Sequence, residues 1–211
     1  PSMRPRLATL TLLVTWLAFA PAQADSPNAA TYQQSYDYEA AGKFDAALRA
    51  FEGMSADSKY TYTYHLRHGW LLYLAGKHAL AVDAYKLAMS KSSRATEPQL
   101  GLLLPLIAAR RFSEASTAAL AVLSTDPKNA TALGKLAWSR YNEGRFQEAA
   151  DAYKKVLADY PGDVELRAGL GWSYLKLGRA ADAVTELRAV LEVAPKHATA
   201  RAGLEQLGQR P

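Results

Sequence analysis

The chain has 211 residues, of which 49% are hydrophobic and 21% charged, so it can bury a core and does not have a disordered-type composition. It has no cysteine, which excludes disulfides, thiolate metal sites, cysteine nucleophiles and a lipidated cysteine. The formal net charge is +5, but basic and acidic residues are interspersed without a basic stripe, so no nucleic-acid partner is expected.

The first segment of the chain has the order of a secretory signal peptide. Residues 1–2, which precede Met3, are interpreted as an expression scar or a misplaced start. A short basic stretch, an apolar run over 7–20 and an Ala-Gln-Ala end follow. We therefore predict a signal peptide over 1–24, cleaved after Ala24, and a periplasmic or secreted protein. The alternative is an uncleaved membrane anchor, although the apolar run is shorter than the roughly 20 residues that span a bilayer.

A helix–turn–helix pattern recurs every 34 residues from residue 28 onward. One small residue marks the second helical run of each unit: Ala47, Ala81, Ala115, Ala149 and Ala183. Glycine stands at the turn between the two runs in four units, where it supplies a backbone conformation that other residues resist. In the third unit Arg110 takes the place of that glycine. Proline closes the last three units because it cannot continue a helix.

These signals divide the chain into five units and a final single helix. The predicted units are 28–61, 62–95, 96–129, 130–163 and 164–197, and the single helix lies within 198–208. One amphipathic helical pair cannot bury its apolar face alone, so the units must stack into a continuous core. We expect one all-α solenoid domain over 28–208, closed by a C-terminal capping helix. Pro105 lies inside the first helix of the third unit. It is interpreted either as sequence drift in a degenerate repeat or as the cause of a bend in the stack.

The period, the small residue of the second helix and the turn glycine together resemble the tetratricopeptide repeat (TPR) family. The resemblance implies a right-handed α-solenoid whose concave groove binds extended peptides. The charged groove of chaperone-binding TPR domains is not matched, because only one of the corresponding positions is basic. Those positions hold Tyr32, Tyr36, Arg67, Leu100 and Gly101.

Two stripes separate on the first helix of each unit. Slots four, seven, eight and eleven, counted from the start of a unit, are expected to pack against the partner helices. Slots two, five, nine and twelve are turned away from them, and the TPR resemblance implies that they line the groove. The ninth slot holds Tyr36, Trp70, Leu104, Trp138 and Trp172. The twelfth slot holds Glu39, Tyr73, Ile107, Tyr141 and Leu175.

The tryptophans of the ninth slot are the main candidates for a binding surface. Aromatic side chains at an exposed concave surface bury much area and dominate many interfaces. The alternative is that these rings stack on neighbouring first helices and complete the core. Two basic residues near the groove, Arg67 and Lys135, can either bind a carboxylate or be solvated surface charges. The predicted partner-binding residues are Tyr36, Arg67, Trp70, Tyr73, Leu104, Ile107, Lys135, Trp138, Tyr141 and Trp172.

These features predict a non-catalytic adaptor or scaffold that binds a peptide or partner helix within an envelope assembly or export system. One alternative is a carbohydrate-binding scaffold of a polysaccharide export system, with sugar rings stacked on the tryptophans. That alternative needs polar groups beside the rings, and the available ones are Gln33, Arg67, Lys135 and Asn142. The other alternative is a self-assembling structural protein. A membrane contact is expected only through an uncleaved signal segment.

No catalytic or cofactor-binding constellation is found in the sequence. His65 and His68 have a spacing that metals can use, but both fall in packing slots without a carboxylate in ligand register. A glycine-rich phosphate loop, a nucleophile elbow and a zinc-protease helix motif are all missing from the sequence. We therefore expect neither an enzyme nor a metal or cofactor site.

Overall fold

The computed structural model describes residues 28–210, and the predicted signal peptide over 1–24 lies outside them. Within the described residues the secondary structure is helical, with no strand. The elements are α1 (Ala29–Ala40), α2 (Phe44–Glu52), the short 3-10 helix η1 (Ala56–Tyr60), α3 (Tyr62–Leu74), α4 (His78–Lys91), α5 (Glu97–Ala108), α6 (Phe112–Thr125), α7 (Ala130–Asn142), α8 (Phe146–Asp159), α9 (Val164–Lys176), α10 (Ala180–Val193) and α11 (Ala198–Gln206).

Polar side chains at a recurring position start four of the odd-numbered helices. Each accepts a hydrogen bond from a backbone N–H three residues further on, which satisfies one of the unpaired donors of the first turn. The capping residues are Thr61, Asn129, Asp163 and His197. They are spaced by multiples of the repeat, so the sequence period fixes where these helices begin.

The turns within the helical pairs require a left-handed backbone. Gly42, Gly76, Gly144 and Gly178 have φ between 68° and 77°. Arg110, which replaces glycine in the third unit, has φ 57° and is the one residue other than glycine with positive φ in the described chain. The turn geometry therefore persists where the glycine is lost. Helix α5 continues through the buried Pro105, which lies within its last turn.

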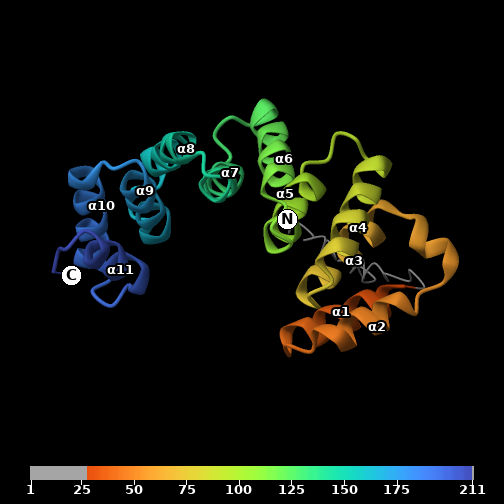
Figure 1. The fold of residues 1–211 in the computed structure, drawn as a ribbon. Coiled ribbons are helices and arrows are strands. Elements are labelled where there is room, and N and C mark those ends of the chain that lie inside the picture. Colours follow the sequence, from red (N-terminus) through yellow and green to blue (C-terminus); the bar gives the residue numbers. More distant parts are fainter. Residues whose placement is uncertain (1–27, 211) are drawn as a thin grey trace, which may run out of the picture.

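The helices stack in chain order, and the predicted small residues lie in the core. The five alanines that mark the units are all fully buried. The backbones of α3, α5, α7, α9 and α11 each come close to the next in this series, whereas the backbones of the described helices α4, α6, α8 and α10 stay further from one another. The odd-numbered helices are thus closer together, and the stack curves with these helices on its inner side (Figure 1).

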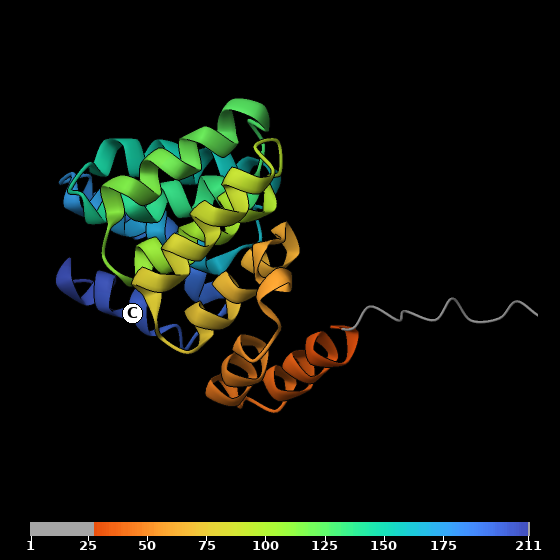
Figure 2. The same ribbon diagram turned by 90° about the vertical axis from the view of Figure 1, so that its right-hand side faces the viewer.

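The result is an arch whose two ends carry α1–α2 and α11 (Figure 1). The backbone of α1 lies close to α2 and not to α3, and α1 reaches α3 only through side chains such as the Arg67–Glu39 pair, so the backbone of the first pair joins the stack through α2 and η1. Figure 2 shows this pair set to one side of the remaining helices. Apolar cores follow the stack from Phe51 in the first pair to Leu204 in α11. Every helix in 28–210 is too short or too polar to cross a membrane.

Candidate interaction groove

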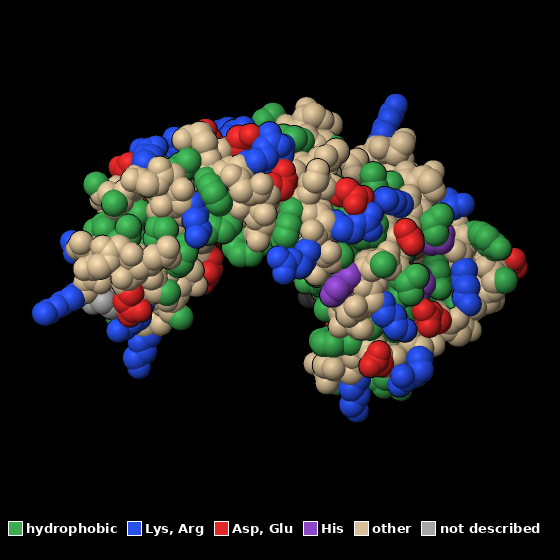
Figure 3. All heavy atoms as spheres, viewed as in Figure 1, with side chains coloured by type: hydrophobic (Ala, Val, Ile, Leu, Met, Phe, Trp, Pro, Cys, Tyr) green, Lys and Arg blue, Asp and Glu red, His purple; other side chains and the backbone are tan. Residues whose placement is uncertain are grey.

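The inner side of the arch carries a cavity of about 850 Å³ between α5, α7 and α9. Figure 3 shows hydrophobic side chains gathered on this inner surface. The cavity is lined mainly by apolar and aromatic residues: Leu100, Leu103, Leu104, Gly134, Trp138, Tyr141, Tyr153, Tyr160, Leu166, Ala168 and Trp172. Its polar side chains are those of Thr131, Lys135, Asp163, Glu165 and Thr199. A cavity of this size suits an extended segment or a drug-sized ligand.

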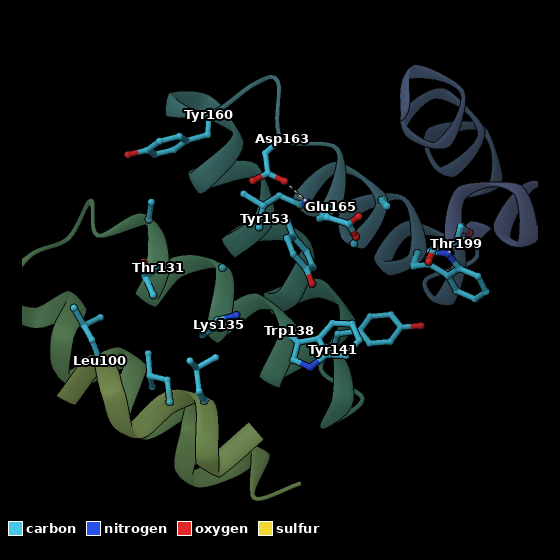
Figure 4. Close-up of a pocket in the computed structure, with 18 residues that line it drawn as sticks. Leu100, Thr131, Lys135, Trp138, Tyr141, Tyr153, Tyr160, Asp163, Glu165 and Thr199 are labelled. Atoms are coloured by element: carbon cyan, nitrogen blue, oxygen red, sulfur yellow. Dashed lines mark hydrogen bonds between the residues drawn. The ribbon is translucent and has the colours of Figure 1, made fainter. Parts of the chain in front are cut away.

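Five of the predicted partner-binding residues line this larger cavity, namely Leu104, Lys135, Trp138, Tyr141 and Trp172. The Trp138 side chain is 47% exposed, which is unusual for so large an apolar ring. It stacks on the Tyr141 ring, with 6.2 Å between the ring centroids and 14° between the planes. Figure 4 shows both rings projecting from α7.

Trp172 also faces the larger cavity, but the end of the stack fixes its orientation. The indole Nε1–H of Trp172 donates a hydrogen bond to the backbone carbonyl of Thr199 in α11, at 2.9 Å. The ring is partly buried and packs against the cluster that includes Leu204. Trp172 therefore serves both as a wall of the cavity and as a contact to the capping helix.

Sequence reasoning missed the side chains that form the floor of the larger cavity. Tyr153 reaches it from α8, a second helix, and its ring lies against the backbone of Gly169. Burial raises the pKa of the Tyr153 hydroxyl above its ordinary value. Tyr160 lies at the rim and is half-exposed. The sequence did contain a pattern that indicates this contact: a glycine follows Tyr153 after sixteen residues, as Gly101 follows Tyr85.

A second cavity of about 400 Å³ lies nearer the N-terminus, between α1, α3 and α5. It contains three further predicted residues, Tyr36, Arg67 and Trp70. The remaining two predicted residues line neither cavity. Tyr73 packs beside Trp70, with 5.6 Å between ring centroids, and Ile107 packs against an apolar cluster between α4 and α5.

The structure contradicts the interpretation of Arg67 as a solvated surface charge. Its side chain is only 7% exposed and forms an ion pair with Glu39. Its Nε–H donates to the Ser35 hydroxyl at 3.1 Å, and its guanidinium stacks over the Tyr36 ring at 3.7 Å. Glu39 also accepts a hydrogen bond from Trp70 Nε1–H at 2.7 Å. The carboxylate that Arg67 can bind is thus supplied by α1 of the same chain.

The two cavities are related by a shift of two repeats. Each residue that lines the smaller cavity has a counterpart 68 positions later that lines the larger one. Several pairs are identical or similar: Thr63 and Thr131, Arg67 and Lys135, Trp70 and Trp138, Tyr85 and Tyr153, Glu97 and Glu165, and Gly101 and Gly169. The main difference is that Tyr32 and Tyr36 are replaced by Leu100 and Leu104. The larger cavity is therefore the more apolar version of the same site.

The two histidines with metal-like spacing have other contacts. His65 is buried against the edge of the Tyr64 ring, and burial lowers its pKa. His68 contacts the Glu52 carboxylate at 3.1 Å, a partner on α2 that the spacing within one helix did not predict. Over residues 28–210, no group of three or more histidine, cysteine, aspartate or glutamate residues is placed to hold a metal ion.

A curved stack of helical pairs with a concave groove has the architecture of a protein–protein interaction scaffold. Two family models of the tetratricopeptide repeat match the chain, one over 32–95 and 104–164 and the other over 140–207. Because these matches cover more than half of the sequence, the chain belongs to the tetratricopeptide repeat family. No curated protein matches the chain.

Solved structures share the fold at low sequence identity. MamA 41-end from Desulfovibrio magneticus RS-1 has a TM-score of 0.73 at 16% identity, covering 80% of this chain and 96% of that one. MamA MSR-1 has a TM-score of 0.69 at 19% identity, covering 82% and 100%. MamA AMB-1 has a TM-score of 0.65 at 18% identity, covering 77% and 96%. At such identities the likeness establishes the TPR-type all-α solenoid and nothing about the partner.

Proposed function

We propose that this chain is a non-catalytic adaptor that binds an extended segment of a partner protein in the groove along α5, α7 and α9. The observation that carries the proposal is the exposed Trp138 in a large, mainly apolar cavity on the inner side of the stack. Exposed aromatic rings in concave pockets are the usual centres of binding energy in interfaces. Membership of the TPR family supports a partner that is a protein.

The carbohydrate alternative is less favoured because most of the polar groups that it needs are already hydrogen-bonded within the chain. Gln33 donates to Asp37, Arg67 to Glu39, and Asn142 to the Trp138 carbonyl. Only Lys135 of the four candidate groups makes no hydrogen bond or ion pair with the described residues. Sugar recognition requires several free polar groups around the stacked ring, so a peptide fits this surface better.

A location in the bacterial envelope is part of the proposal and depends on the segment 1–24, which has the order of a signal peptide. The test is a fusion of residues 1–30 to a reporter enzyme that is active only after export. We expect activity from the fusion, and none when the apolar run over 7–20 is interrupted by two arginines. Activity that does not depend on the apolar run would contradict the envelope location.

The groove itself is tested by site-specific photo-crosslinking in cells. A photoreactive phenylalanine analogue at Leu104, on the cavity wall, should capture a partner protein. The same analogue at Leu120, which is 46% exposed on α6, should not, and it serves as the matched control. Trp138→Ala should abolish the crosslink from Leu104 while leaving the helical content unchanged, because the ring is half-exposed. Loss of folding in this variant would assign the ring to the core and remove the proposal.

A further inference from the structure

Two residues that line the smaller cavity, Arg67 and Trp70, share a carboxylate partner that has no counterpart in the later repeat. Glu39 accepts hydrogen bonds from both the Arg67 guanidinium and the Trp70 indole. The residue 68 positions after Glu39 is Ile107, so the later repeat has no corresponding carboxylate. The cation and the indole are nevertheless retained there, as Lys135 and Trp138.

All the internal partners of Arg67 have apolar counterparts in the larger cavity. Ser35 and Tyr36 are replaced by Leu103 and Leu104, in the same way that Glu39 is replaced by Ile107. Within residues 28–210, the Lys135 ammonium and the Trp138 Nε1–H therefore have no hydrogen-bond partner.

The two donors are placed to act together. Lys135 and Trp138 are three residues apart on α7, a spacing that puts both side chains on one helix face. Figure 4 shows both at the wall of the cavity. Lys135 is partly buried beside apolar side chains, so its charge is less screened there than on an open surface.

The acidic residues that line the larger cavity are engaged elsewhere. Asp163 accepts the Leu166 N–H as the N-cap of α9, at 3.0 Å. Glu165 is 78% exposed and contacts the His197 ring at 3.0 Å. Neither pairs with Lys135, so a carboxylate that pairs with this lysine must come from outside the described chain.

We propose that the larger cavity binds a glutamate side chain of the partner segment, whose carboxylate bridges Lys135 Nζ and Trp138 Nε1. The inference rests on the proposed peptide-binding function and specifies the residue that the groove selects. Glu39 shows how a glutamate side chain can accept hydrogen bonds from the equivalent cation and indole, Arg67 and Trp70. The flanking residues of the partner segment should be apolar, because leucines line the cavity on both sides of Lys135. Hydrogen bonds in which one group is charged are among the stronger polar contacts, so they can decide specificity.

The first test needs no partner. Ile107→Glu places a carboxylate at the position that corresponds to Glu39, and Ile107→Gln is the uncharged control of the same size. We expect Ile107→Glu to shift the indole N–H signal of Trp138 downfield in ¹H–¹⁵N spectra of the full chain. Ile107→Gln should not produce that shift, and neither variant should move the Trp70 signal. Equal Trp138 signals in the two folded variants would overturn the inference.

The second test uses three short peptides of defined sequence. Acetyl-Ala-Leu-Glu-Leu-Ala-amide should bind about tenfold more tightly than the corresponding glutamine peptide, as measured from the Trp138 indole signal. Lys135→Met should remove this preference while retaining weak binding of both peptides. A glutamine peptide that ends in a free carboxylate should bind like the amidated glutamine peptide. If it binds as tightly as the glutamate peptide, a chain terminus and not a glutamate is the ligand, which contradicts the proposal.

The two proposals fail separately. If all three peptides bind equally and Lys135→Met has no effect, the groove binds peptides but the glutamate inference is wrong. If none of the peptides moves the Trp138 signal, the glutamate inference is again wrong, while the crosslink from Leu104 still decides the adaptor function. If that crosslink is missing but the glutamate peptide binds with the expected preference, the cavity recognises the carboxylate and the protein-adaptor proposal fails.

Discussion

The ring of Tyr153 lies directly against the backbone of Gly169, so closely that a Cβ atom on this glycine would be 2.4 Å from Tyr153 Cζ. Two repeats earlier, a Cβ on Gly101 would be 2.4 Å from Tyr85 Cε1. The absence of a side chain at these two glycines lets a tyrosine from a second helix reach the inner side of the stack. The floor of each cavity therefore depends on a tyrosine and the glycine that it contacts.

Gly169→Ala should therefore destabilise the fold, because the inserted methyl group meets an aromatic ring that is itself buried. We expect a loss of about 1–3 kcal/mol in the free energy of unfolding, measured by urea denaturation. Gly162→Ala is the control, since a Cβ there meets nothing within 4 Å and the residue has no positive φ. Tyr153→Leu should relieve the clash in Gly169→Ala. Equal stability of the two glycine variants would contradict the observed contact.

Arg110→Gly should stabilise the third helical pair. Arg110 has φ 57°, a left-handed conformation that costs a residue with a side chain about 1–2 kcal/mol, and glycine regains this at a smaller entropic cost. The net gain in the free energy of unfolding should be about 0.5–1 kcal/mol. Arg110→Ala removes the same charge without relieving the backbone, so it should give no gain. A gain of equal size from alanine would show that charge and not backbone conformation is responsible.

The cap of α11 provides a prediction with an internal reference. His197 Nδ1 accepts the Ala200 N–H at 3.2 Å, in the position where Asp163 caps α9. His197→Ala should lower stability by about 1 kcal/mol, whereas His197→Asp should retain most of it because aspartate is a good N-cap. Thermal unfolding of both variants provides the comparison. If they are equally destabilised, the cap is not the source of the effect.

The ion pair between Arg67 and Glu39 should be sensitive to removal of one partner. Glu39→Gln leaves a guanidinium that is 7% exposed without its counter-charge, and we expect a loss of about 3 kcal/mol. Replacing both residues, with Glu39→Leu and Arg67→Met together, should recover much of this loss. With the single variants Glu39→Leu and Arg67→Met, the double variant completes a double-mutant cycle, and urea denaturation of all four proteins measures the coupling. A double variant less stable than Glu39→Gln would mean that the pair contributes more than charge compensation.

Burial of His65 predicts a specific pH dependence of stability. Its pKa is lowered in the folded protein by burial, and to a smaller extent by Lys91 and His68. The unfolded chain therefore takes up the proton first, so the contribution to stability is present above about pH 6.5 and is lost as pH falls below it. His65→Asn should lose less stability than the original chain between pH 7.5 and 5. Parallel pH profiles by urea denaturation would contradict this assignment.

The fold was predictable from the sequence because its determinants are local and periodic. Buried alanines, turn glycines and capping side chains recur at one interval. Each acts within its own helical pair or on the first turn of the helix that it precedes. The positive φ of Arg110 also followed from its place in the period. The predicted ninth slot brought Trp138 and Trp172 to one cavity for the same reason.

What the tertiary structure decided is how these side chains share the inner surface of the stack. The sequence alone placed Arg67 and Lys135 in equivalent positions, but only the packing of α1 beside α3 shows that Glu39 pairs with one and that the other stays free. Tyr153 reaches the cavity from a second helix, which a stripe drawn on first helices cannot show. The physical reason is the range of the contacts. Helix geometry relates residues within a few positions of one another, whereas these contacts join residues on different helices and depend on how the helices are spaced.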